Sequence, residues 1–106
     1  MSNHPVYYSS AASIASAIRN REISVLEMVE IHLHRIEAVN PKLNAVVTLA
    51  TERALKEARD ADKALANGRE TGVLHGVPIT IKDSIETEGI VTTAGTEGLE
   101  HYRPKR

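Results

Sequence analysis

The stretch from Leu74 to Thr96 (LHGVPITIKDSIETEGIVTTAGT) is the sequence feature that most constrains how this chain can fold. Three β-branched residues alternate with other residues along its first half: Val77, Ile79 and Ile81. Because side chains two residues apart on a strand share one face, this alternation predicts a β-strand that ends at Lys82. Pro78 cannot donate a hydrogen bond to a neighbouring strand. The strand is therefore expected at a sheet edge, or with Pro78 near its start.

Lys82 closes the apolar run and is followed at once by Asp83. The residue types alone leave two interpretations open. Lys82 is either a catalytic base mounted on a rigid strand end, where functional groups gather in open α/β sheets, or a solvated lysine at the end of an ordinary strand. Asp83 is expected to be a structural hydrogen-bonding residue rather than a second base.

Hydrophobic periodicity predicts three helices before this stretch: residues 10–19, 25–39 and 51–67. The second helix has the clearest signals. Ser24 and Glu27 form an S-x-x-E capping box at its start, and Asn40-Pro41 is expected to end it. Residues 1–8 are expected to form a flexible arm.

Two histidines on the second predicted helix, His32 and His34, raise the question of a metal site. Residues two apart on a helix are separated by about 200° of rotation, so these side chains face opposite directions and cannot chelate one ion. We therefore reject a metal site. His34 is expected to be exposed, and His32 to have a hydrogen-bonded packing role.

The order of the predicted elements indicates an α/β fold. Residues 43–49 (LNAVVTL) are short, β-branched and bounded by turn residues, which predicts a buried strand. With the helix over 51–67 and the strand ending at Lys82, this gives one βαβ unit with a right-handed crossover. The narrow apolar stripe of the third helix is expected to lie on the sheet, and its members are Ala54, Ala58, Ala61 and Leu65.

The composition limits the possible partners and compartments. The 106 residues include no Phe, no Trp and three Tyr, so the core consists of small aliphatic side chains and reads as a layer that needs partner structure. The net charge of −1 gives no electrostatic case for nucleic acid or an anionic membrane. There is no Cys, no apolar run of membrane-spanning length and no secretory leader pattern, so a cytoplasmic protein is expected.

Two blocks of this chain match a known pattern. Residues 76–83 read G-V-P-I-T-I-K-D, and residues 89–96 read G-I-V-T-T-A-G-T. Together they resemble the first catalytic block of the amidase signature family. The helix start at Ser24 to Glu27, Arg35-Ile36-Glu37 and the NPKLNA run over 40–45 resemble the same family's N-terminal region. The likeness covers nearly the whole chain and keeps the family's order.

The resemblance implies a fold and a chemistry. Residues 1–106 would be the N-terminal portion of a single amidase-type domain. They would supply the N-terminal helices and the first βαβ unit of a mixed sheet covered by helices, which is incomplete here. The activity would be hydrolysis of carboxylic amides by a Ser–cis-Ser–Lys triad, with Lys82 as the base. A lysine base must be neutral at the working pH, which requires burial or a hydrogen bond to the neutral amine.

The sequence departs from the family because neither triad serine is present. Both family serines lie in a Gly/Ser-rich loop further along, and no such loop occurs before Arg106. Ser84 stands two residues from Lys82 but has no glycine-rich backbone to build an oxyanion hole. The chain is therefore expected to be part of a longer enzyme and inactive alone. Its expected partners are a small-molecule amide and the rest of the same domain, with no cofactor and no metal.

Two alternatives stay open at this point. The chain is either part of such a hydrolase or a truncated, non-catalytic module that binds a partner chain. The glutaminase subunit of a tRNA-dependent amidotransferase shares the same block and adds partner subunits. The residues present here do not separate that subunit from a free-standing amidase.

Overall fold

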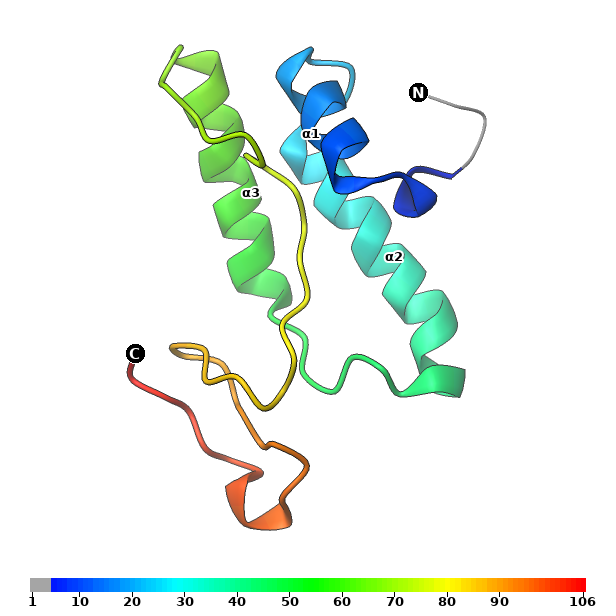
Figure 1. Cartoon of the computed structure of the whole chain (residues 1–106), viewed down its shortest axis with the longest axis vertical. Helices are drawn as coiled ribbons and strands as arrows, with labels where there is room; N and C mark the ends of the chain where they lie inside the picture. Colours follow the sequence, from blue (N-terminus) through cyan, green and yellow to red (C-terminus); the bar gives the residue numbers. More distant parts are fainter. Residues whose placement is uncertain (1–4) are drawn as a thin grey trace.

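The computed structural model describes residues 5–106, in which three α-helices are followed by a long irregular segment (Figure 1). The elements are the 3₁₀ turn η1 (Val6–Tyr8), α1 (Ala11–Arg19), α2 (Val25–Leu43), α3 (Thr51–Ala66) and the 3₁₀ turn η2 (Glu97–Leu99). The three helices were predicted from the sequence, and their positions confirm that prediction. The first ends at Arg19 and the third at Ala66, within one residue of expectation.

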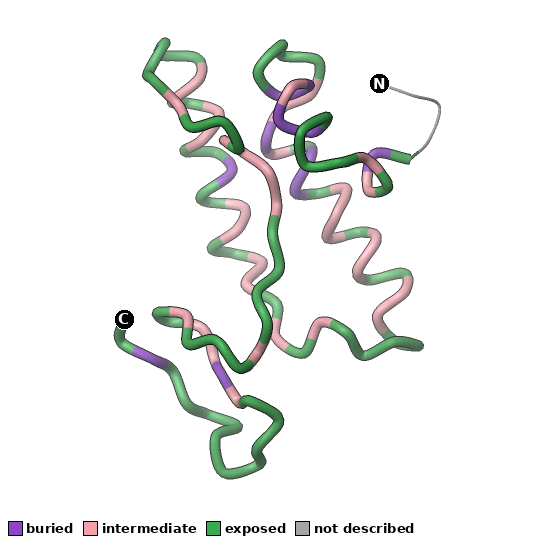
Figure 2. Tube along the Cα trace, viewed as in Figure 1, coloured by how far each residue is buried: buried purple, intermediate pink, exposed green. Residues whose placement is uncertain are grey.

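The core lies where the three helices meet. α2 and α3 run antiparallel side by side, and α1 packs near the start of α2 (Figure 1). Most of the buried positions lie at this junction (Figure 2). The core cluster consists of Val6, Ile14, Ile18, Val25, Met28, Val29 and Ala58. Ile18 and Met28 are the largest fully buried ones. Each such side chain stabilises the fold by about 1.5–3 kcal/mol relative to an exposed position.

Two residues cap the start of α2, Ser24 and Asp62. The sequence predicted Ser24 but not Asp62. The Ser24 hydroxyl oxygen accepts a hydrogen bond from the Glu27 amide at 3.0 Å, which confirms the predicted cap. The Glu27 carboxylate accepts from the Ser24 hydroxyl at 3.1 Å rather than from the Ser24 amide. Asp62 of α3 accepts from the next two free amides, those of Val25 at 2.8 Å and Leu26 at 3.1 Å. A carboxylate at this end also matches the positive pole of the helix dipole.

Replacing Asp62 with alanine is expected to destabilise the chain by about 1–2 kcal/mol, because two helix-terminal amides lose their acceptor. Denaturant unfolding followed by circular dichroism measures this change in the free energy of unfolding. Glu57→Ala on the same helix is the matched control. It removes an exposed pair with Arg53 and should cost less than about 0.5 kcal/mol. Equal effects from the two variants would contradict a special role for Asp62.

The prediction that Asn40-Pro41 ends the second helix is wrong. α2 continues to Leu43 with Pro41 inside its last turn, and Asn44 ends it in the left-handed conformation (φ 49°). The Asn44 amide donates to the Asn40 carbonyl at 2.6 Å. The Asn40 side chain donates to the Val46 carbonyl and accepts from the Val46 amide, both at 2.9 Å. Asn40 therefore stabilises the exit from the helix, although the sequence pattern assigned it to a break.

The predicted strands are not present among residues 5–106, so the expected βαβ unit is not formed there. Leu43 lies in α2 and residues 44–50 form a loop, whereas residues 77–82 form no ladder with any described segment. An isolated antiparallel bridge joins Thr87 and Ile90. The apolar alternation before Lys82 is real, but a strand also needs a neighbouring strand to pair with. Ile79 is 76% exposed and Ile81 is 47% exposed, so this apolar pattern lies uncovered.

The apolar stripe of α3 faces another helix instead of a sheet. Ala58 is 2% exposed and belongs to the core cluster that includes Met28 and Val29 of α2. The small alanine side chain lets the two helices approach closely, which is the property that the sequence pattern suggested for packing on a sheet. The expected sheet beneath α3 is not present among the described residues, where the stripe contributes to a helical hairpin.

The N-terminal segment is partly described. Of the arm expected over residues 1–8, residues 1–4 lie outside the described residues. Val6–Tyr8 form η1, and Val6 is buried against the core. None of the helices in residues 5–106 is both long enough and apolar enough to cross a membrane.

Candidate active site

Lys82 lies on the irregular segment that follows α3. It is exposed, and its carbonyl accepts a hydrogen bond from the Ile85 amide at 2.9 Å. This bond closes a turn over residues 82–85, so Lys82 is the last residue of an extended run and the first of a turn. Ser84, inside that turn, is also exposed. The lysine side chain therefore lies exposed at a turn of the backbone, where another group could contact it.

Asp83 ties this bend to the second block of the motif. Its carboxylate accepts hydrogen bonds from the Thr93 amide at 2.9 Å and from the Thr93 hydroxyl. Its backbone carbonyl accepts from the Ala94 amide at 3.0 Å. The prediction that Asp83 is a structural hydrogen-bonding residue is confirmed. We call this set of three bonds between Asp83 and residues 93–94 the Asp83 clasp.

The partner side of the clasp is a tight turn over residues 93–96. The Thr96 amide donates to the Thr93 carbonyl at 2.9 Å, and both central residues have positive φ: Ala94 at 51° and Gly95 at 74°. These angles define a type I′ turn, which explains the glycine at position 95. The Gly95 amide also donates to the Thr93 hydroxyl oxygen at 3.2 Å. The Thr93 side chain is thus fixed from both sides.

The hydrogen bonds also determine the charge of the clasp. The Thr93 hydroxyl, and then the Thr93 amide, stabilise the ionised Asp83 carboxylate and hold its pKa below the usual value of 3.8. The carboxylate is therefore ionised at neutral pH, so the clasp is fully formed there and weakens only as the pH falls through this lowered pKa.

The clasp belongs to a small unit built from residues 82–106. The Gly89 amide donates to the Pro104 carbonyl at 2.8 Å, and the Thr92 amide donates to the Tyr102 carbonyl at 2.9 Å. Thr92 is buried, and its hydroxyl donates to the Ile90 carbonyl at 3.1 Å. These bonds join the second motif block to the segment that ends at Arg106. The sequence pattern over residues 97–106 gave no signal of this pairing.

Two contacts fix the motif to the helices. Arg53 of α3 donates to the Glu88 carbonyl at 2.7 Å, which links the first turn of α3 to the residue directly before the second motif block. At the other end, His75 forms a hydrogen bond through Nε2 with the Ala61 carbonyl at 2.9 Å. Gly76 then lies directly on the core: a Cβ placed there would be 2.6 Å from Val25 Cγ2. The sequence gave no indication of the role of Arg53, because an exposed arginine on a helix carries no distinctive pattern.

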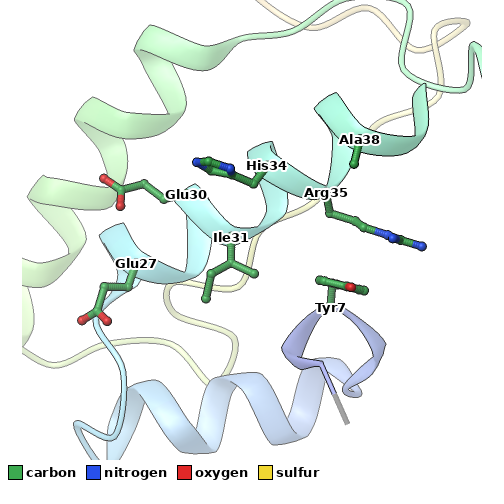
Figure 3. Close-up of a pocket in the computed structure, with 7 residues that line it drawn as sticks. All are labelled: Tyr7, Glu27, Glu30, Ile31, His34, Arg35 and Ala38. Carbon is green, nitrogen blue, oxygen red and sulfur yellow. The ribbon is translucent and has the colours of Figure 1, made fainter. Parts of the chain in front are cut away.

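The two histidines lie as expected. His32 is half-buried and bonds through Nδ1 to the Met28 carbonyl at 2.8 Å, which confirms its packing role. His34 is exposed on α2, as predicted. It borders a hollow between α2 and η1 (Figure 3), lined by Tyr7, Glu27, Glu30, Ile31, His34, Arg35 and Ala38. The Arg35 guanidinium lies 4.6 Å from the centre of the Tyr7 ring. None of these lining residues belongs to the motif, so the hollow is separate from the Lys82 site.

Comparison with known proteins identifies the family to which this arrangement belongs. The structure of a bacterial aryl acylamidase of the amidase signature enzymes matches 94% of this chain and 21% of its own chain, with a TM-score of 0.89 and 34% sequence identity. The Amidase family model matches residues 27–106, which contain the clasp and both motif blocks. The chain therefore belongs to the amidase signature family.

The curated relatives include proteins named as amide hydrolases and proteins named as amidotransferase subunits. Indoleacetamide hydrolase of Bradyrhizobium diazoefficiens is 55% identical over 98 residues, which cover 92% of this chain and 19% of that protein. A glutamyl-tRNA(Gln) amidotransferase subunit of Carboxydothermus hydrogenoformans is 46% identical over 99 residues, covering 93% of this chain and 20% of that protein. This chain thus spans about a fifth of the length of the curated relatives it matches.

Proposed function

We propose that this chain is the N-terminal portion of an enzyme that hydrolyses carboxylic amides, with Lys82 as the general base. The observation that carries the proposal is the position of Lys82 within the residues matched by the Amidase family model. It stands directly before Asp83, whose carboxylate bonds the second block of the same motif. We call the longer protein the complete enzyme, and the relatives' lengths support its existence.

The proposed chemistry follows from what a neutral lysine can do. Lys82 takes a proton, through a bridging serine in a cis peptide, from a second serine. That serine attacks the amide carbonyl and forms an acyl-enzyme as the amine leaves with a proton returned to it. Water then attacks the acyl group and releases the acid. Both serines belong to the rest of the complete enzyme, which would also cover the exposed Lys82 side chain and favour its neutral form.

The rest of the enzyme would also complete a sheet. The amides of residues 79–82 donate no backbone hydrogen bond within the described part of the chain, and the Ile79 and Ile81 side chains are exposed. A neighbouring strand would satisfy these amides and cover the apolar side chains at once. The first βαβ unit is thus proposed for the complete enzyme.

The test of this function is ammonia release from a panel of primary amides that includes indole-3-acetamide and glutamine. The complete enzyme is expected to hydrolyse at least one of them, whereas residues 1–106 alone release none because they lack both serines. A complete enzyme that hydrolyses no amide would contradict the proposal. Turnover by residues 1–106 that disappears on Lys82→Ala would contradict the need for the rest of the enzyme.

A second candidate function is that of an amidotransferase subunit. It is favoured by the relatives that are named as subunits of glutamyl-tRNA(Gln) amidotransferase. In the same panel, this function predicts ammonia release from glutamine that depends on partner subunits. Hydrolysis of indole-3-acetamide by the complete enzyme alone would favour the free-standing amidase.

A further inference from the structure

We propose that Thr93, through the Asp83 clasp, is a positioning residue for Lys82 and fixes the backbone from which the base reaches its proton donor. This inference rests on the proposed function, because it concerns the same lysine. It gives the second motif block a positioning role, although none of its residues takes part in the reaction.

The backbone on the two sides of Lys82 differs in how firmly it is held. On the N-terminal side, the amides of residues 79–82 donate no backbone hydrogen bond within the described part of the chain. On the C-terminal side, Asp83 is held through both its carboxylate and its carbonyl. Apart from the bond that the Lys82 carbonyl accepts from Ile85, the clasp is the nearest fixed point of the base.

The clasp is rigid because its partner side is preorganised. The Thr93 hydroxyl donates to Asp83 and accepts from the Gly95 amide at 3.2 Å, so its rotamer is fixed. The type I′ turn fixes the backbone at residues 93–96. The pKa of Asp83 is lowered by these same bonds, so the carboxylate keeps its accepting form near neutral pH. Because these hydrogen bonds hold the turn, we expect its geometry to stay the same when Lys82 changes position.

The same unit connects the base to the helical core. Arg53 donates to the Glu88 carbonyl at 2.7 Å and so attaches the segment before Thr93 to α3. One connection from α3 to Lys82 therefore runs through the second motif block and the clasp, and the other runs from His75 along residues 76–82. This gives a physical reason why the two blocks of the motif occur together: the first carries the base, and the second holds the residue that follows it.

Accurate placement matters because proton transfer depends steeply on distance. A misplacement of about 1 Å costs a rate factor of about 100. Thr93→Val removes the hydroxyl while keeping a β-branched side chain of the same shape, and it changes no charge. We expect it to lower kcat of the complete enzyme by about 10- to 100-fold, with KM unchanged within about twofold, because substrate binding is not the step affected. Thr93→Ser restores the hydroxyl and is expected to recover most of the lost kcat.

Thr92→Val is the matched control in the neighbouring position. The Thr92 hydroxyl is buried and donates to the Ile90 carbonyl, so its loss weakens the same loop without touching the clasp. A merely structural role for the loop predicts equal losses from Thr92→Val and Thr93→Val, and that result would overturn the proposal. So would wild-type kcat in Thr93→Val, or failure of Thr93→Ser to recover kcat. If Thr93→Val does not fold, Asp83→Asn is measured by the same criteria.

Lys82→Ala separates failure of this inference from failure of the proposed function. If Lys82→Ala retains full activity, Lys82 is not the base, and both proposals fail. If Lys82→Ala is inactive while Thr93→Val has the kcat of the wild type, the proposed function stands and only the positioning role is overturned.

Discussion

Replacing Lys82 with alanine is expected to lower kcat of the complete enzyme by about 1,000-fold or more, because under the proposed function the serine nucleophile loses the base that activates it. The same variant should no longer be acylated by a fluorophosphonate probe, which reports the reactivity of the serine independently of the substrate. Both readouts address the base itself, because the probe needs no amide recognition. Mass spectrometry of the intact protein measures the labelling.

Within residues 5–106, Lys82→Ala is not expected to cause unfolding. The Lys82 side chain is exposed, and no hydrogen bond or ion pair to it is present within residues 5–106. Exposed substitutions of this kind change stability by less than about 0.5 kcal/mol. Lys63→Ala, at an exposed position of α3, is the matched control and should keep full activity.

Lys82→Arg distinguishes a base from a fixed positive charge. Arginine keeps the cation but does not lose its proton at any working pH, so it cannot accept the proton from serine. It is therefore expected to be as inactive as Lys82→Ala. Substantial activity in Lys82→Arg would rule out Lys82 as the base and leave only an electrostatic role. Normal probe labelling of Lys82→Ala would also rule out Lys82 as the base, and it would rule out an electrostatic role in activating the serine.

Local signals in the sequence were sufficient for the helices. The capping box at Ser24 and the helical periodicity after it predicted α2, because a helix satisfies its own backbone hydrogen bonds and needs only one apolar face. Its end was misplaced. Asn40-Pro41 has the pattern of a break, whereas the helix ends where Asn44 adopts positive φ.

For the strands, local signals in the sequence were not sufficient. The alternation ending at Ile81 indicates which side chains would share a face, but a strand exists only with a paired neighbour. The described residues provide no such neighbour, so the pattern appears as extended backbone with exposed apolar side chains.

The residues of the candidate site were predicted from local patterns, but their long-range contacts were not. Lys82 and Asp83 were recognised from their motif, and the hydrogen-bonding role of Asp83 was inferred from its residue type. That its partner would be Thr93 did not follow from spacing, because the contact depends on the type I′ turn around Ala94 and Gly95. The carboxylate of Asp62 was missed as well. It caps a helix 37 residues earlier in the chain, and no local pattern encodes such a long-range contact.

Gly76→Ala is expected to destabilise the chain by about 2–5 kcal/mol through two separate penalties. The first is conformational: Gly76 has φ +84°, where an L-residue is strained. The second is steric, since the new Cβ would lie 2.6 Å from Val25 Cγ2 and 3.1 Å from Ile18 Cδ1. Val25 is 2% exposed and Ile18 is 1% exposed, so neither side chain has free space into which to move.

Two other glycines separate these penalties. Gly68 has φ +66° and no neighbouring atom within 4 Å of the place that a Cβ would take, so Gly68→Ala carries only the conformational cost, about 1–2 kcal/mol. Gly72 has neither feature, and Gly72→Ala should be close to neutral. Denaturant unfolding of the three variants should therefore give a graded series, with Gly76→Ala the most destabilised. If Gly76→Ala lowers the free energy of unfolding no more than Gly68→Ala does, the neighbouring core side chains move to accommodate the new methyl group. The start of the motif would then not be fixed by its close contact with α1 and α2.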